Sequence, residues 1–429
     1  MTITVEQSFL EGTVRAPASK SVMIRALAAA LLSRDLTVLH HPSRCDDALA
    51  ALQVIRALGA DVEEERERWS VRGGIALRED VLDVGESGLT ARLFIPLASL
   101  LSQPMTITGR GSLMQRPMTM VEEPLGSLGV AVTTTGGMLP VTVRGPLQGG
   151  RAVVDGSKGS QFLTGLLMSL PLTKQETVLE VENLRSIPYI DLTLDMMRRF
   201  GVVAEHDGEY RRFRVPGSQE YHAAEITVEG DWSGGAFLLV AAALAGDLKI
   251  TGLAMTSAQA DRKILEALER AGVAVEAADD HLHIRKSEVR PFTFDITHCP
   301  DLAPPLVCLG AAAEGTTVLR GAGRLREKES DRAVTLQELA GRLGVHIDLE
   351  GDEMIIHGGT LTGGDAEAHQ DHRIAMAAAV MALRAPQPVT IHGAECVNKS
   401  YPEFFDDLEK LGGIVGTMND ERSRKTADL

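Results

Sequence analysis

The sequence predicts an α/β (α+β) fold with two domains, each made of three βαβαββ repeats. Three observations lead to this prediction: the length of the chain, a glycine that recurs about every seventy residues, and apolar helices that begin in step with it. The chain has 429 residues, which is more than a single hydrophobic core usually organises. At least two domains are therefore expected.

The composition is that of a globular protein, with 44% hydrophobic and 24% charged residues. No apolar run is long enough to span a membrane, and the first residues do not read as a secretory signal. We therefore expect a cytoplasmic protein with no membrane partner. The net charge of −16 argues against binding to nucleic acid. The four cysteines are scattered without a CxxC pair, so we expect free thiols.

The recurring glycine follows a helical pattern and precedes alternating apolar residues. Glycine takes this place where a helix ends and a strand begins. It occurs six times, and successive copies lie 68 to 72 residues apart when their numbers are subtracted: Gly59, Gly129, Gly201, Gly272, Gly344 and Gly412. Six copies at one period indicate six repeats. In the fifth repeat, residues 345–347 and 354–356 also have the pattern of a β-hairpin.

Helices rich in alanine and leucine are predicted at the same period. Their starts lie near Lys20, Gly88, Ser160, Trp232, Asp301 and Asp371. A second helix is expected to open at Arg116–Pro117 in the second repeat, and others at Ser186–Tyr189, Glu327–Arg332 and Asn398–Pro402. Each repeat therefore holds two helices and several short strands.

The six repeats fit two domains of three. The first is expected to span residues 18–228, with the break in the segment 223–229. The strand-like start, with Ile3, Val5 and Val14, has no repeat of its own. We therefore assign residues 1–17 and 229–429 to the second domain, with residues 419–429 as a frayed polar tail.

The chemistry-bearing residues gather at the predicted helix starts. Lys20, Ser21 and Arg25 stand at the first, where free backbone N–H groups and the helix dipole favour an anion. Asp301 and Glu329 are carboxylates among such cations, a setting that suits proton transfer. Taken singly, each motif has a plainer interpretation as a capped surface helix, a glycine–serine turn or a solvated charge cluster.

Other site classes find no support in the sequence. His369 and His372 could suggest a metal pair, but no third ligand stands at a persuasive spacing. There is no GxxxxGK[ST] loop and no complete GxGxxG after a strand, so neither ATP nor NAD binding is indicated.

Taken together, the motifs resemble the enolpyruvyl transferase family over nearly the whole chain, from Lys20 to Lys399. In chain order they are SKSVMIRAL, GESGLTARL, MQRP, DGSKGSQFLTGLLM, SIPYIDLT, PDLAPPL, REKESDR, QDHRIAM and NKSYPEFF. The resemblance implies an inside-out, barrel-like α/β fold whose two three-repeat domains close over the substrates. It implies enolpyruvyl transfer from phosphoenolpyruvate to the 5-hydroxyl of shikimate 3-phosphate, by a monomer without metal or organic cofactor.

The resemblance also implies roles for individual residues. Contacts to shikimate 3-phosphate fall on Lys20, Ser21, Arg25, Ser160, Ser186, Asp301 and Lys328. Contacts to phosphoenolpyruvate fall on Lys20, Gly88, Arg116, Gln161, Arg332, Arg373 and Lys399. Asp301 and Glu329 are implied as the proton-transfer carboxylates, with Lys20 assisting.

Two alternatives remain at this point. Some enolpyruvyl transferases use UDP-N-acetylglucosamine, but these usually have Asn after the first lysine, where Ser21 stands, and a Cys in the loop that here spans residues 109–116. A non-catalytic phosphometabolite-binding protein would need the cations but not the Asp301–Glu329 pair.

The chain departs from the common family pattern at three positions. Glu86 stands in place of Asn, Leu89 in place of Thr, and Gly159 in place of the first of two serines. The first two flank Gly88, so they bear on the charge of the phosphoenolpyruvate pocket and on its sensitivity to glyphosate.

Overall fold

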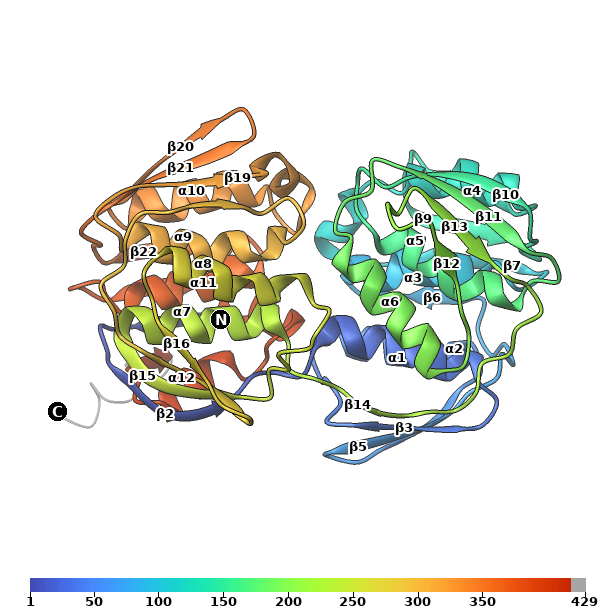
Figure 1. The fold of residues 1–429 in the computed structure, drawn as a ribbon, viewed down its shortest axis with the longest axis horizontal. Helices are drawn as coiled ribbons and strands as arrows, with labels where there is room; N and C mark the ends of the chain where they lie inside the picture. The colour runs from blue at the N-terminus through green and yellow to red at the C-terminus, as the bar shows by residue number, and fades with distance from the viewer. Residues whose placement is uncertain (418–429) are drawn as a thin grey trace. The chain divides into compact units, whose positions relative to one another are not determined.

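The computed structural model describes residues 1–417, and the expected frayed tail at 419–429 lies outside these residues. The chain divides into two compact domains (Figure 1). The first domain is Ala18–Glu229, and the second is Met1–Pro17 with the chain from Gly230 onward. No helix within residues 1–417 is long and apolar enough to cross a membrane.

The described residues form six four-stranded sheets. One example shows the pattern: β6 runs parallel to β7, and β9 and β8 continue the sheet in antiparallel order. A helix joins the parallel strands, a second helix follows, and a hairpin ends the repeat. This is the βαβαββ repeat, and the predicted fold class is confirmed.

The bounds of the elements follow from hydrogen bonding along the chain. The first domain contains α1 (Lys20–Leu32), β3 (Leu36–His40), α2 (Asp46–Ala57), β4 (Asp61–Glu64), β5 (Arg68–Arg72), β6 (Val81–Asp83), α3 (Gly88–Ala98), β7 (Pro104–Thr108), η1 (Gly111–Gln115), η2 (Thr119–Val121), α4 (Glu122–Ser127), β8 (Ala131–Thr135), β9 (Met138–Arg144), β10 (Arg151–Asp155), α5 (Gln161–Ser169), η3 (Leu170–Leu172), β11 (Thr177–Glu182), α6 (Pro188–Arg199), β12 (Glu205–His206), β13 (Arg212–Val215) and β14 (Glu225–Thr227).

The second domain follows the same plan. It contains β1 (Thr2–Val5), β2 (Leu10–Arg15), α7 (Trp232–Ala245), β15 (Gly246–Thr251), η4 (Ala260–Lys263), α8 (Ile264–Arg270), β16 (Val275–Ala277), β17 (His281–Arg285), β18 (Thr293–Asp295), η5 (Pro300–Leu302), α9 (Ala303–Ala311), β19 (Gly315–Arg320), η6 (Ala322–Glu327), α10 (Arg332–Arg342), β20 (His346–Glu350), β21 (Glu353–Gly358), β22 (Gly364–Glu367), α11 (His372–Ala382), β23 (Val389–His392), η7 (Ala394–Lys399), α12 (Phe404–Lys410) and β24 (Val415–Thr417).

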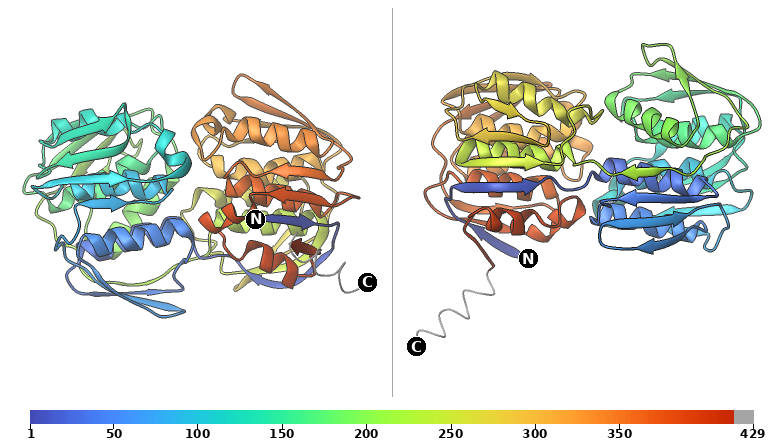
Figure 2. Two further views of the ribbon diagram at one scale, coloured as in Figure 1. Left: turned by 180° about the vertical axis from the view of Figure 1, so that it is seen from behind. Right: turned by 60° about the horizontal axis from the view of Figure 1, so that its bottom comes forward.

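The helices that open the repeats form the core of each domain. Every residue of α7, α9 and α11 is buried, and the three helices pack against one another. In the first domain, α3 packs closely on α5, and α1 contacts α3 and α6. The sheets lie around these helices (Figure 2). A helix enclosed on all sides must be apolar all round, which is why alanine and leucine fill these segments.

The recurring glycine does what its position predicts. All six copies have a left-handed φ, between 80° and 119°. Residues with a side chain rarely adopt this conformation, so glycine is favoured where the second helix of each repeat ends.

The N-terminal segment contributes two strands, where the sequence suggested one. β1 pairs with β23 and β24, and β2 pairs in parallel with β15. The prediction that this segment completes a sheet of the second domain is confirmed, but it enters two sheets. In the opposite sense, β14 precedes α7 yet pairs with β3 of the first domain. β2 and β14, which directly precede α1 and α7, thus each pair in the domain other than that of the helix that follows them.

The helix start predicted at Arg116–Pro117 is wrong, and the helix predicted to open at Asn398–Pro402 begins later, at Phe404, after η7. The second helix of the second repeat was expected at Arg116–Pro117, but α4 begins at Glu122, after two short 3₁₀ turns. Arg116 has an extended backbone, with φ −87° and ψ 135°. A residue before proline is disfavoured in the helical region, so the helix cannot open there.

Candidate active site

The first predicted anion site lies at the start of α1. Ser19 caps the helix, because its hydroxyl accepts a hydrogen bond from the backbone N–H of Val22 at 3.4 Å. Lys20 is the first helical residue, and its Nζ lies 3.0 Å from Oδ2 of Asp47, which is 5% exposed. The sequence analysis missed Asp47, because an acidic residue in the first turn of α2 looks like an ordinary partner of the helix dipole.

Arg25 is buried one turn further along α1, and every hydrogen-bond partner given for it is uncharged. Its Nε donates to Oγ1 of Thr193 at 2.9 Å, and its Nη1 donates to the carbonyl of Ser21 at 2.9 Å. Its Nη2 reaches Oγ1 of Thr164 and the carbonyl of Tyr189. Burial without a carboxylate lowers the pKa of Arg25 to about 10, although it remains charged at neutral pH. A buried positive charge of this kind favours an anionic ligand.

A second cationic place surrounds Gly88, the first residue of α3. A β-carbon there would lie 2.6 Å from Nη1 of Arg116 and 3.1 Å from Nη1 of Arg92. Only glycine leaves room for the two guanidinium groups. Arg92 is held by Oε1 of Gln161 at 2.8 Å. Arg116 buries an Nε donor for which the described residues offer no acceptor. Buried donors are nearly always satisfied, so this one points to a ligand.

The predicted serine contacts lie at two helix starts. Ser160 is 3% exposed and precedes α5 without making a capping hydrogen bond. Ser186 is 7% exposed and has a φ of +58°, which is strained for a residue with a side chain. Such strain persists where surrounding structure imposes it, often at functional sites. Ser21 is half-buried beside Lys20.

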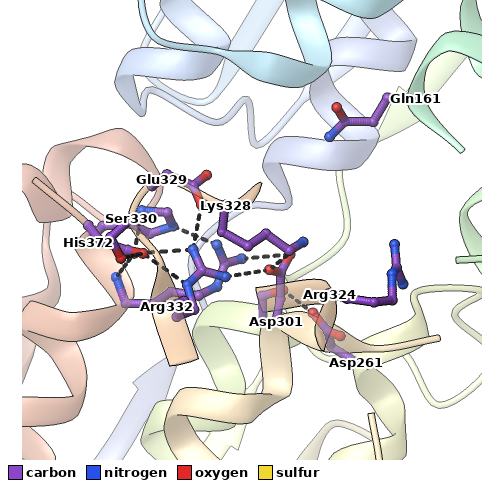
Figure 3. A network of polar contacts seen from close by, with 12 residues as sticks. Gln161, Asp261, Asp301, Arg324, Lys328, Glu329, Ser330, Arg332 and His372 are labelled. Atoms are coloured by element: carbon purple, nitrogen blue, oxygen red, sulfur yellow. Dashed lines mark hydrogen bonds and ion pairs between the residues drawn. The ribbon is translucent and has the colours of Figure 1, made fainter. Parts of the chain in front are cut away.

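The second domain holds a network of charges centred on Arg332 (Figure 3). This side chain is 0% exposed, and all of its nitrogens donate to carboxylates of the chain itself. Nε donates to Oδ2 of Asp371 at 2.9 Å, Nη1 to Oδ1 of Asp301 at 2.8 Å, and Nη2 to Glu329. Burial disfavours its charge, but Asp371, Glu329 and Asp301 together raise the pKa of Arg332. Arg332 therefore fixes these carboxylates in place.

Asp301 lies among three cations. Its Oδ1 also accepts from Nζ of Lys328 at 3.3 Å, and its Oδ2 lies 3.4 Å from Nη2 of Arg373. Burial works to raise the pKa of Asp301, but Arg373, Lys328 and Arg332 outweigh burial and hold that pKa well below its ordinary range. As it stands, Asp301 is a firmly ionised carboxylate.

Lys328 shows the reverse effect. Burial lowers the pKa of its ammonium group to about 8, although Asp301 opposes the shift. The nearby charges of Arg332 and Arg324 add to the lowering. A lysine with this pKa is charged at neutral pH and can exchange a proton at mildly alkaline pH.

Arg373 is positioned by its neighbours at the start of α11. Asp371 caps the helix by accepting from the backbone N–H of Arg373 at 3.0 Å. The Nη1 of Arg373 lies 2.7 Å from Nε2 of His372, and because a guanidinium only donates, the imidazole accepts. The Nε of Arg373 is buried without an acceptor among residues 1–417, as is that of Arg116 in the first domain. Lys399 ends η7, which packs on α11, and is 6% exposed.

Asp261 is a buried carboxyl that the sequence analysis missed. It lies in η4, is 1% exposed, and accepts a hydrogen bond from the hydroxyl of Ser233. Burial first, and then the charge of Asp301, raise the pKa of Asp261 to about 7, while Ser233 and Arg373 act against this rise. No motif marked it, because only the folded chain packs η4 and η5 against the same helix, α7, and brings Asp261 near Asp301.

The predicted site residues thus form two groups, one in each domain. The first domain holds Lys20, Ser21, Arg25, Gly88, Arg116, Ser160, Gln161 and Ser186. The second holds Asp301, Lys328, Glu329, Arg332, Arg373 and Lys399. In the first group, α5 links the two cationic places, because Gln161 contacts Arg92 and Thr164 contacts Arg25.

Other candidate chemistry is not assembled in the described part of the chain. Within residues 1–417, no group of three or more His, Cys, Asp or Glu side chains is placed to hold a metal ion. The Nε2 of His369 lies 3.2 Å from Oε2 of Glu338, and the Nε2 of His372 accepts a hydrogen bond from Arg373. All four cysteines are free, as predicted.

Comparison with solved structures places the fold among the enolpyruvyl transferases. The chain is similar to an EPSP synthase from Acinetobacter baumannii, with a TM-score of 0.82 and 28% identity over 97% of this chain and 100% of the other. It is also similar to the enolpyruvyl transferase NikO from Streptomyces tendae, with a TM-score of 0.79. At 19% identity, the second likeness shows the fold alone.

Sequence comparison narrows the class to one family. The chain belongs to the EPSP synthase (3-phosphoshikimate 1-carboxyvinyltransferase) family, whose profile matches residues 5–408. It is 36% identical to the 3-phosphoshikimate 1-carboxyvinyltransferase of Clostridium kluyveri, over 96% of this chain and 98% of that protein. It is also 36% identical to the enzyme of the same name from Methanocorpusculum labreanum, with 96% and 99% coverage.

Proposed function

We propose that this chain transfers the enolpyruvyl group of phosphoenolpyruvate to the 5-hydroxyl of shikimate 3-phosphate and releases phosphate. The observation that carries the proposal is that Arg116 and Arg373, one in each domain, both bury an Nε donor for which residues 1–417 supply no acceptor. The resemblance to the enolpyruvyl transferases assigns both residues to phosphoenolpyruvate. Its carboxylate and phosphate are the acceptors that a guanidinium fork matches.

The reaction needs proton transfers at two atoms. The methylene carbon of phosphoenolpyruvate gains a proton, and the 5-hydroxyl oxygen bonds to the adjacent carbon as it loses its own. The tetrahedral intermediate then loses a methyl proton and expels phosphate, which restores the double bond. We assign these transfers to Asp301 and Glu329, with Lys20 assisting. Both carboxylates are held in fixed orientation by Arg332.

The charge balance at Asp301 gives substrate binding a role in preparing this carboxylate. Without ligand, Arg373, Lys328 and Arg332 keep Asp301 firmly ionised and therefore weakly basic. An anionic substrate on Arg373 or Lys328 offsets part of that positive charge, so the pKa of Asp301 rises toward a value suited to proton transfer. Asp301 becomes a competent base when the substrate is in place.

The remaining residues bind the two substrates. Ser21, Arg25, Ser160, Ser186 and Lys328 hold shikimate 3-phosphate, and Gly88, Arg116, Gln161, Arg332, Arg373 and Lys399 hold phosphoenolpyruvate. The nitrogens of Arg332 already donate hydrogen bonds to carboxylates of the chain, whereas the Nε of Arg373 has no acceptor within residues 1–417. Arg373 therefore has the more available donor for phosphoenolpyruvate. We also propose that the protein is a cytoplasmic monomer, that its substrates are small molecules, and that it needs no metal ion.

A phosphate-release assay tests the proposal. Purified protein with phosphoenolpyruvate and shikimate 3-phosphate should release phosphate and form the carboxyvinyl product, which mass spectrometry identifies. UDP-N-acetylglucosamine in place of shikimate 3-phosphate should give no release, and a chelator should leave the rate unchanged. Release with the nucleotide sugar alone would overturn the proposed acceptor, and a zinc-restorable loss with chelator would overturn the metal-free reaction.

A further inference from the structure

Glu86 has no part in the proposed function, yet its carboxylate occupies a constrained place. It lies in the turn between β6 and α3 and is half-buried. A β-carbon on Gly111 would lie 2.3 Å from Oε1 of Glu86, 2.4 Å from Cδ and 2.8 Å from Oε2. Gly111 has a φ of +59° and is the first residue of η1. The carboxylate is therefore seated directly on the backbone of Gly111.

The contact between Glu86 and Gly111 is part of a wider contact between residues 85–86 and residues 109–111. The backbone N–H of Arg110 donates to the carbonyl of Gly85 at 2.8 Å. A β-carbon on Gly109 would lie 2.7 Å from the same carbonyl oxygen. The turn that contains Glu86 and the segment leading into η1 thus run against each other. Glu86 ends this contact at the point where the chain turns into η1.

Both segments lead to the arginine pair at Gly88. Gly88, two residues after Glu86, is the first residue of α3, and α3 also contains Arg92. On the other side, η1 ends at Gln115 and Arg116 follows at once. The Nη1 of Arg116 would lie only 2.6 Å from a β-carbon on Gly88. The contact between Glu86 and Gly111 therefore joins the two chain segments whose ends bring this guanidinium to Gly88.

We propose that Glu86 is a positioning residue for the arginine pair at Gly88, and that it sets the affinity of this place for a phosphorylated carboxylic acid. The carboxylate, seated on Gly111, holds η1 so that Arg116 stays beside Gly88. The identity of the ligand as phosphoenolpyruvate rests on the proposed function. The effect on affinity follows because an ionic hydrogen bond weakens steeply when its donor is misplaced.

The alternative role for Glu86, electrostatic repulsion of the ligand, predicts the opposite change in affinity. If its negative charge acted mainly by repelling the ligand, removing that charge would strengthen binding. Glu86→Gln keeps the shape and removes the charge, Glu86→Ala removes the contact, and Gly111→Ala displaces the carboxylate but leaves its chemistry intact. Gly136→Ala is the matched control, because Gly136 has a φ of +61° and a β-carbon there meets nothing within 4 Å.

Steady-state kinetics with both substrates test the proposal. Glu86→Ala and Gly111→Ala should each raise the KM for phosphoenolpyruvate about tenfold, a factor within the range of coupling between contacting residues. The KM for shikimate 3-phosphate and the melting temperature should change little beyond the Gly136→Ala control, and Glu86→Gln should have a smaller effect than Glu86→Ala. An unchanged or lowered KM for phosphoenolpyruvate in both contact variants would overturn it.

Hydrogen exchange provides a readout that does not need turnover. Backbone amides of residues 111–116 should exchange faster in Glu86→Ala than in the wild type, while those of the β8–β9 hairpin stay unchanged. If the wild type shows no turnover, the proposed function fails, and the exchange result still decides whether Glu86 holds η1. Unchanged exchange in residues 111–116 would refute the positioning role even if the wild type is active.

Discussion

The two domains share one architecture but balance their charges differently. In the first, Arg25 is held by hydroxyls and carbonyls. In the second, Arg332 is surrounded by Asp301, Glu329 and Asp371. Lys20 differs from Arg25, because it pairs with the carboxylate of Asp47.

This difference in the partners of the cations suits them to two different functions, anion binding and proton transfer. Cations with neutral partners keep an uncompensated positive charge, which favours an anionic ligand. Cations with carboxylate partners instead orient groups that can move protons and hold their ionisation states. Under the proposed function, the first domain chiefly holds anions and the second supplies the acid–base groups, although Arg373 also retains an open donor.

The largest expected effect concerns the carboxylates of the second domain. Glu329→Gln and Asp301→Asn should each lower kcat by about 10²–10⁴-fold, the range typical of general acid–base groups. Binding of both substrates, followed by titration calorimetry, should weaken far less. Near-normal turnover in both variants would show that the second domain does not supply the proton-transfer groups.

A smaller effect is expected from the uncompensated cation of the first domain. Arg25→Lys should raise the KM for shikimate 3-phosphate roughly tenfold to hundredfold, because hydrogen bonds to charged groups contribute about 1.5–3 kcal/mol and lysine cannot reproduce the guanidinium fork. The value of kcat should fall less. The exposed Arg34→Lys serves as control. A fall in kcat with an unchanged KM would instead place Arg25 among the acid–base groups.

The smallest effect concerns the pH dependence of stability. The folded state raises the pKa of Asp261 to about 7 from an ordinary value of 3.8, so the fold favours its protonated form. That preference stabilises the protein at low pH and is lost as pH rises through about 7. Asn mimics the protonated acid, so Asp261→Asn should raise the Tm at pH 8 by a few degrees and change it little at pH 4.5.

Calorimetry at the two pH values checks this prediction, with the exposed Asp279→Asn as control. An equal Tm shift at both pH values would mean that Asp261 acts through packing and not through its ionisation. The comparison between domains would then rest on Asp301 and Glu329 alone.

The sequence by itself determined the repeat and the cations. Six glycines at one period required six left-handed helix ends, and all six have them. Local rules of this kind need only the few residues around each position, which is why they can be read from sequence. They failed where a neighbour intervened, as at Arg116, whose backbone Pro117 keeps extended.

Only the tertiary structure decided which groups face the cations. Asp47, Asp261 and Asp371 meet their partners through contacts between separate helices, and no local pattern distinguishes such acids from helix caps. The partners of β1 and β2 were also not predictable from local sequence, because β1 pairs with β23 and β24 and β2 pairs with β15, all far away in the chain. Charge compensation and strand pairing depend on distances of a few ångströms between residues far apart in the chain, and packing alone sets those distances.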